Sequence, residues 1–240
     1  MVINSIGFLI LPKQKIVGLM KHIIMKLSEA YFPLFTAEWK DKYRALLSDE
    51  HLQSLNKNIQ KFKTQTLDWH LPSFNEEISV DRNSSFTTFI RILESQNTNE
   101  YKAQQLEKIS FDHWLNILGQ RLTSASIRDE NAVPPVRAVL IEACEKPFNQ
   151  EITIAQRAWE KHCGRTDNPF WGNIQGNNQQ KQQKVMEKVH STLDLKTWWN
   201  VFFHYKHGPV FEVREKEGHG IRWSHGGRQL IGFLEPFINE

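Results

Sequence analysis

Glycine-containing turns divide the last part of the chain into short segments, and this pattern restricts the fold more than any other feature of the sequence. Gly208-Pro209, Gly218-His219-Gly220 and His225-Gly226-Gly227 bound three runs suited to extended structure, at residues 210–215, 221–224 and 230–234. Short runs of β-branched and aromatic residues between glycine turns are typical of antiparallel hairpins. The sequence therefore predicts a three-stranded antiparallel β-meander at the C-terminus.

Most of the chain before this meander has the spacing of amphipathic helices. Apolar residues recur at i, i+3, i+4 and i+7, as in Phe86, Phe89, Ile90 and Leu93, and about seven to nine helices are predicted. The last one spans residues 195–205, with an apolar stripe of Leu195, Trp198, Phe202 and Tyr205. We therefore predict an α+β fold, mainly helical, with a small C-terminal three-stranded antiparallel β-meander packed on this helix.

Composition changes near Lys146-Pro147. Five of the eight tryptophans and six of the ten histidines follow this point. The change predicts a helical region at residues 1–146 and a second region at 147–240 that holds helices and the β-meander. One continuous domain remains the alternative, because no linker sequence marks the boundary.

The overall charge and the cysteine content limit the partners and the cellular location that can be expected for the protein. The net charge of +3 and the pI of about 8.8 permit contact with nucleic acid without requiring it. Two cysteines in 240 residues do not form a disulfide framework, so a reducing, cytoplasmic location is expected. No apolar run approaches the ~20 residues of a transmembrane helix. Residues 13–27 form a basic amphipathic pattern, for which a core helix is favoured and contact with a membrane surface is the alternative.

Several common catalytic motifs are absent from the sequence. There is no phosphate-binding G-x-x-x-x-G-K-[ST] loop, no G-x-G-x-x-G, no G-x-S-x-G, no H-E-x-x-H and no C-x-x-C. We therefore predict no bound cofactor and no resident metal, and support is lost for ATPases, nucleotide-dependent dehydrogenases and zinc proteases.

Polar residues suited to acid–base and phosphate chemistry gather on the predicted meander and just before it. Histidine titrates near neutral pH, and arginine binds phosphate. Glu212 and Arg214 alternate along the first strand and so share one face, which Arg222 of the next strand joins if the register allows. The candidate catalytic residues are His204, His207, His219, Glu212, Arg214 and Arg222.

Two other interpretations of these residues stay open at this stage. Alternating charges are also what an antiparallel sheet presents to water, and this solvated face is the favoured alternative. The H-x-x-H pair, His204 and His207, with Glu212 or His219, also has the composition of a zinc site, although the spacing is not specific.

The aromatic residues raise the question of base stacking. Phe170, Trp171, Trp198, Trp199 and Trp223 are candidates for such a platform, although a core position is favoured for most of them. Trp171 and Trp199 are expected nearest the surface, because they fall in a loop or off the apolar stripe.

The function predicted from these residues is a protein that acts on nucleic acid and, more specifically, a small metal-independent nuclease. The alternative is a non-enzymatic interaction or regulatory module whose helical region binds a partner protein. Replacing Arg214 or Arg222 with alanine is expected to abolish activity while leaving the melting temperature nearly unchanged, because both are placed on an exposed face.

Overall fold

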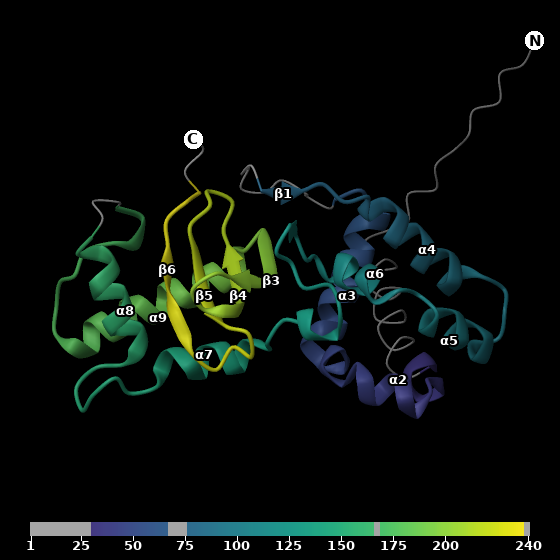
Figure 1. Ribbon diagram of the computed structural model, residues 1–240, viewed down its shortest axis with the longest axis horizontal. Helices are drawn as coiled ribbons and strands as arrows, with labels where there is room; N and C mark the ends of the chain where they lie inside the picture. The colour runs from purple at the N-terminus through teal and green to yellow at the C-terminus, as the bar shows by residue number, and fades with distance from the viewer. Residues whose placement is uncertain (1–29, 67–75, 166–168, 238–240) are drawn as a thin grey trace, which may run out of the picture.

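The structure is a computed structural model that describes residues 30–66, 76–165 and 169–237. The basic amphipathic segment at 13–27 lies outside these residues. Figure 1 shows two halves side by side, with the N-terminal helices on the right and the C-terminal sheet with its own helices on the left.

Eight α-helices are present among the described residues: α2 Ala37–Lys42, α3 Asp49–Lys63, α4 Arg82–Glu94, α5 Asn99–Glu107, α6 Phe111–Leu118, α7 Arg137–Glu145, α8 Ile154–Cys163 and α9 Asn178–Leu195. Short 3-10 turns occur at Phe32–Leu34, Arg44–Leu47, Glu130–Ala132 and Pro169–Trp171. None of the helices in this described part combines the length and the apolar character that crossing a bilayer requires.

The helix starts in the N-terminal half follow the capping residues of the sequence. The side chains of Thr36 and Ser48 accept hydrogen bonds from the backbone amides of Trp39 and His51, as N-caps do. Helix α6 ends at Leu118 because the next residue, Gly119, adopts a φ of +103°. The predicted helical character of this half is confirmed.

The C-terminal sheet contains four antiparallel strands in the order β3-β4-β5-β6. Their bounds are Trp198–His204, Gly208–Arg214, Gly220–Ser224 and Leu230–Leu234. The three predicted strands are β4, β5 and β6. The mixed α+β class is confirmed, and the number of strands was predicted one too low.

The predicted helix at residues 195–205 is wrong, because most of this segment is strand β3. Helix α9 ends at Leu195, and the sheet begins at Trp198. The sequence Trp-Trp-Asn-Val-Phe-Phe is rich in residues that favour strands, and alternate residues Trp199 and Val201 lie on the buried face. The helical spacing of Leu195, Trp198, Phe202 and Tyr205 is therefore a coincidence. The segment that was predicted to be the packing helix forms the fourth strand of the sheet.

A segment from the helical half runs along the outer edge of β3. The amides of Arg121 and Ile127 donate hydrogen bonds to Trp199 O and Val201 O, each at 2.9 Å, and the amide of Phe203 donates to Ala125 O at 2.9 Å. A short two-stranded sheet, β1 Glu77–Ile78 with β2 Leu122–Thr123, adjoins this segment. The pairing satisfies the free edge of β3 and attaches the sheet to the helical half.

The two faces of the four-stranded sheet differ in chemistry. One face carries apolar side chains that pack against α7, α8 and α9, among them Trp199, Phe211, Val213, Trp223 and Phe233. Indole Nε1 of Trp223 donates to Leu140 O of α7 at 3.3 Å. The register places the polar residues Asn200, Glu212 and Arg222 side by side on the opposite face. The boundary predicted near residue 146 stays a prediction, although α7, which precedes it, packs with the C-terminal elements.

Candidate functional site on the polar face of the sheet

Glu212 lies at the centre of the polar face, between two arginines. Nε of Arg214 lies 2.5 Å from Oε1 of Glu212, and Arg222 reaches Oε2 through Nε at 2.7 Å and Nη2 at 2.6 Å. Each carboxylate oxygen thus has its own guanidinium, and the triad keeps one net positive charge. The register, which the sequence left open, places Arg214 and Arg222 on the same face with Glu212 between them.

This triad is not a solvated strand face. Glu212 is fully buried and the side chain of Arg214 is 3% exposed, whereas that of Arg222 is 14% exposed. Nη1 of Arg214 donates to the carbonyls of Gly218 and Glu235, and its guanidinium lies 3.7 Å from the centroid of the Phe237 ring. The expectation of an exposed Arg214 is therefore wrong, because the chain after β6 covers it.

The side chain of Arg222 is more exposed than that of Arg214. Glu212 takes up Nε and Nη2, while Nη1 of Arg222 has no hydrogen-bond partner within the described part of the chain. The ring of Phe202 lies 5.7 Å from the guanidinium carbon. Since the side chain of Arg222 is also the more exposed of the two, at 14% against 3%, its Nη1 is the donor better placed for an anion, and Glu212 fixes its orientation.

His204 and His207 lie at the turn between β3 and β4. Their rings stack with centroids 5.0 Å apart. Nδ1 of His204 accepts a hydrogen bond from the amide of Lys206 at 3.2 Å, so the neutral ring carries its proton on Nε2. Partial burial, followed by the positive charges of Arg222 and His207, lowers the pKa of His204. His204 is therefore a neutral hydrogen-bond donor near pH 7, and His207 is its exposed neighbour.

The structure does not bring His219 together with these two histidines. His219 lies in the turn that follows β4, at the other end of a seven-residue strand, which spans about 20 Å. The Phe170 ring stacks on the His219 ring with centroids 3.8 Å apart, and Nε2 of His219 lies 3.5 Å from Oε2 of Glu235. Burial lowers the pKa of His219 against the opposing effect of Glu235.

A second histidine shares the Glu235 carboxylate. Nε2 of His162, on α8, lies 2.8 Å from Oε1 of Glu235. This pairing was not predicted from the sequence, because 73 residues separate the two partners and no motif joins them. Among the described residues, no group of three or more His, Cys, Asp and Glu side chains is arranged to hold a metal ion.

Four of the five aromatic residues singled out for base stacking are buried, and the fifth, Phe170, is half-buried against the core. Trp171 and Trp199 are buried, contrary to the expectation that they lie near the surface, and Trp198 and Trp223 are buried as well. Trp199 donates from Nε1 to Leu118 O at 3.3 Å and so helps to join the two halves. Among the described residues of the C-terminal half, the exposed aromatic side chains are instead Phe148, Phe203 and Tyr205.

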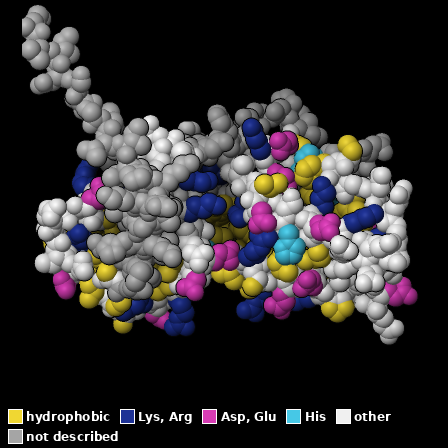
Figure 2. Space-filling view, turned by 180° about the vertical axis from the view of Figure 1, so that it is seen from behind, with side chains coloured by type: hydrophobic (Ala, Val, Ile, Leu, Met, Phe, Trp, Pro, Cys, Tyr) yellow, Lys and Arg dark blue, Asp and Glu magenta, His cyan; other side chains and the backbone are white. Residues whose placement is uncertain are grey.

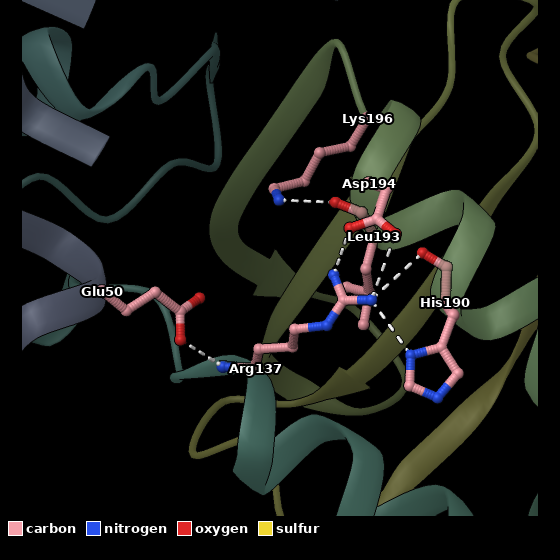
Figure 3. Close-up of polar contacts among 6 residues, drawn as sticks. All are labelled: Glu50, Arg137, His190, Leu193, Asp194 and Lys196. Carbon is pink, nitrogen blue, oxygen red and sulfur yellow. Dashed lines mark hydrogen bonds and ion pairs between the residues drawn. The ribbon is translucent and has the colours of Figure 1, made fainter. Parts of the chain in front are cut away.

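A further polar cluster joins the two halves of the molecule and was not predicted. Figure 3 shows Arg137 between Glu50 of α3 and Asp194 of α9. The Arg137 amide donates to Glu50 Oε2 at 2.7 Å, and its Nη1 lies 2.6 Å from Asp194 Oδ1. Nη2 also contacts Nδ1 of His190 at 3.0 Å. These residues are too far apart in the sequence to form a recognisable motif.

A cavity of about 80 Å³ lies next to this cluster, between the two halves. His51, Lys196 and Trp199 are among its lining residues. Lys196 is an exposed residue whose ammonium group donates to Leu193 O at 2.7 Å, and burial of this group lowers its pKa. Figure 2 shows a depression between the two halves. Hydrophobic side chains lie inside this depression, and basic side chains border it. The contacts around Arg137 join α3 to α7 and α9.

Residues 141–235 match the family model of the CdiA C-terminal tRNase toxin domain. The matched segment takes in most of α7, then α8, α9 and the whole four-stranded sheet, and so contains every residue of the predicted cluster. It covers less than half of the chain, and the helical half lies outside it. No curated protein and no solved structure matches the chain. The family match supports the broader prediction, a protein that acts on nucleic acid, in the manner of a nuclease toxin.

Proposed function

We propose that the C-terminal half cleaves RNA, with transfer RNA as its substrate, and that the polar face of the sheet is the active site. The observation that carries this proposal is the position of Arg222. A buried carboxylate holds its guanidinium on the face of the sheet opposite α7, α8 and α9, and Nη1 has no hydrogen-bond partner among the described residues. The match of this segment to a tRNase toxin domain supports RNA as the substrate.

RNA supplies its own nucleophile, the 2′-hydroxyl, so its cleavage needs groups that move protons and hold the phosphate. In the proposed reaction the 2′-oxygen bonds to phosphorus and the bond from phosphorus to the 5′-oxygen breaks. Arg222 binds the phosphate and stabilises the charge that develops on it. Nε2–H of His204 donates to the same phosphate, and the exposed His207 accepts the 2′-hydroxyl proton. A solvent water protonates the departing 5′-oxygen, so the products are a 2′,3′-cyclic phosphate and a 5′-hydroxyl.

Glu212 and Arg214 have positioning roles in this proposal. Both carboxylate oxygens of Glu212 are bound by guanidinium groups, so this residue orients Arg222 and does not abstract a proton. Arg214 is buried and connects Glu212 to the backbone of Gly218 and Glu235. His219 contributes to the packing of the β4–β5 turn. The cytoplasmic location predicted from the two cysteines is compatible with a tRNA substrate.

The experiment is cleavage of total tRNA by the purified full chain, with and without EDTA, resolved on denaturing gels. We expect cleavage that persists in EDTA, and a loss of about 100-fold or more in rate for Arg222→Ala and His207→Ala. Arg91→Ala, an exposed arginine on α4, is the matched control and should cleave like the unmodified chain. Absence of tRNA cleavage by the unmodified chain would overturn the proposed function, and full activity of Arg222→Ala would overturn the proposed site.

A second candidate function, binding of a partner protein through the helical half, is kept as the alternative. The exposed Tyr101 and Ile78 are single apolar residues on that half, which is ordinary for a protein surface.

A further inference from the structure

The end of the β3–β4 hairpin carries aromatic side chains that are exposed in the structure. Tyr205 is 92% exposed and Phe203 is 62% exposed, although both are large hydrophobic residues. Gly208 closes this turn with a φ of +68°, and the amide of His207 donates to His204 O at 3.2 Å. The aromatic side chains therefore project from an ordered hairpin end.

The exposed tyrosine has a preformed stack beneath it. The rings of Tyr205 and His204 stack with centroids 4.7 Å apart, and His204 in turn stacks on His207. The hydrogen bond from the Lys206 amide to Nδ1 of His204 holds the middle ring in place. A flat ring supported from one side offers its other side to another flat group.

The charges around this turn favour nucleic acid over an apolar peptide. Lys206, which lies between Tyr205 and His207 in the sequence, is exposed. The turn from Tyr205 to Gly208 contains no acidic residue. The positive charge of Arg222 is close enough to depress the pKa of His204. Stacking aromatic rings next to basic groups are the combination with which proteins bind single-stranded RNA.

We propose that Tyr205, supported by His204 and His207, is a stacking subsite for one unpaired base of single-stranded RNA. This inference rests on the proposed function, because it places the base next to the phosphate held by Arg222. Phe202, beside that guanidinium, and Tyr205 are three residues apart, about 10 Å along an extended chain. A strand whose phosphate lies at Arg222 thus brings a neighbouring base to Tyr205. Paired bases are stacked within a duplex and cannot use this surface, so the substrate class is a loop or a single-stranded end.

The test is binding of a fluorescein-labelled, 2′-O-methylated oligouridine to the full chain, followed by fluorescence anisotropy. Methylation removes the 2′-hydroxyl, so the probe is not cleaved. We expect Tyr205→Ala to raise the Kd about 5- to 20-fold, with no change in melting temperature, and Tyr205→Trp to bind like the unmodified chain. Tyr101→Ala, which removes an exposed tyrosine from α5, is the matched control and should leave the Kd unchanged.

A second probe separates stacking from charge. The same oligonucleotide with abasic positions keeps every phosphate, so its affinity should be equal for the unmodified chain and for Tyr205→Ala. If Tyr205→Ala binds the base-carrying probe normally, or loses equal affinity for both probes, the stacking subsite is wrong. Cleavage of tRNA by the unmodified chain, measured separately, then shows whether the proposed function survives that failure.

Discussion

Glu212 and Arg222 face each other directly in the β4–β5 pair, and one carboxylate oxygen of Glu212 accepts a hydrogen bond from Nε of Arg222 and forms an ion pair with its Nη2. Since this oxygen holds the guanidinium by two nitrogens, the charge of Arg222 has a defined position relative to the β3–β4 turn. Its electrostatic effect on His204 at that turn follows from this arrangement.

Removing the charge of Arg222 should therefore raise the pKa of His204. Burial and the charges of Arg222 and His207 hold this pKa below the ordinary value of 6.5, because a nearby cation disfavours a second one. We expect an upward shift in Arg222→Ala and none in Arg222→Lys, measured by NMR titration of the imidazole signals. Arg228→Ala, an exposed arginine in the β5–β6 turn, serves as the control. An unchanged His204 pKa in Arg222→Ala would contradict the position assigned to the guanidinium.

Replacement of Arg214 with alanine should strongly destabilise the fold, in contrast to the expectation from sequence alone. Its side chain is buried against Glu212 and the chain after β6, and removing one partner of a buried ion pair typically costs about 3–5 kcal/mol. Arg44, which pairs with Asp41 on the surface, provides a matched control whose loss should stay within about 1 kcal/mol. Urea unfolding measures both variants. A similar small loss in both would show that Arg214 is not structural.

The sequence predicted the elements whose signals are local. The helical stripe of Phe86 and Phe89 and the glycine turns around His219 depend on residues only a few positions apart. The register that brings Arg222 opposite Glu212 was left open by the sequence, because strand pairing depends on the whole sheet.

Strand β3 was mistaken for a helix because its partners are remote in the sequence. Its outer edge pairs with the segment around Ala125, and its inner edge pairs with β4. The burial of Arg214 was likewise hidden, because the residues that cover it, Glu235 and Phe237, follow the last strand. The candidate site could thus be predicted as a set of residue types, while the division of roles between Arg214 and Arg222 required the tertiary structure.

Acidification should weaken the fold through His51. Burial lowers the pKa of this side chain in the folded state, where Nδ1 lies 2.9 Å from Ala45 O. As the pH falls below about 6.5, the unfolded chain binds a proton before the folded chain does, so the free energy of unfolding decreases. One such proton contributes a slope of at most about 1.4 kcal/mol per pH unit.

His51→Gln provides the comparison for this effect, because it removes the titration. We expect the free energy of unfolding to fall less steeply between pH 7 and pH 5 in His51→Gln than in the unmodified chain. Above pH 7 the two slopes should coincide, since the histidine is neutral in both states. Identical slopes over the acidic range would show that His51 does not couple to folding.

The β5–β6 turn gives a paired test of the packing between the sheet and the start of α7. Gly227 has a φ of +73°, and a Cβ at this position would lie 2.6 Å from Cβ of Pro135 and 3.0 Å from Cδ2 of Leu140. The proline ring is rigid and cannot move aside, and a left-handed conformation costs a residue with a side chain about 1–2 kcal/mol. Gly226, its neighbour, has no atom within 4 Å of such a Cβ and no positive φ.

Gly227→Ala should therefore lose about 2 kcal/mol or more, whereas Gly226→Ala should stay within about 1 kcal/mol of the unmodified chain. In a chain of this size the larger loss lowers the Tm by roughly 4–8 °C. Thermal unfolding followed by circular dichroism measures both variants under the same conditions. Equal Tm values for the two alanine variants would mean that the turn does not pack on Pro135 and Leu140 as the structure places it.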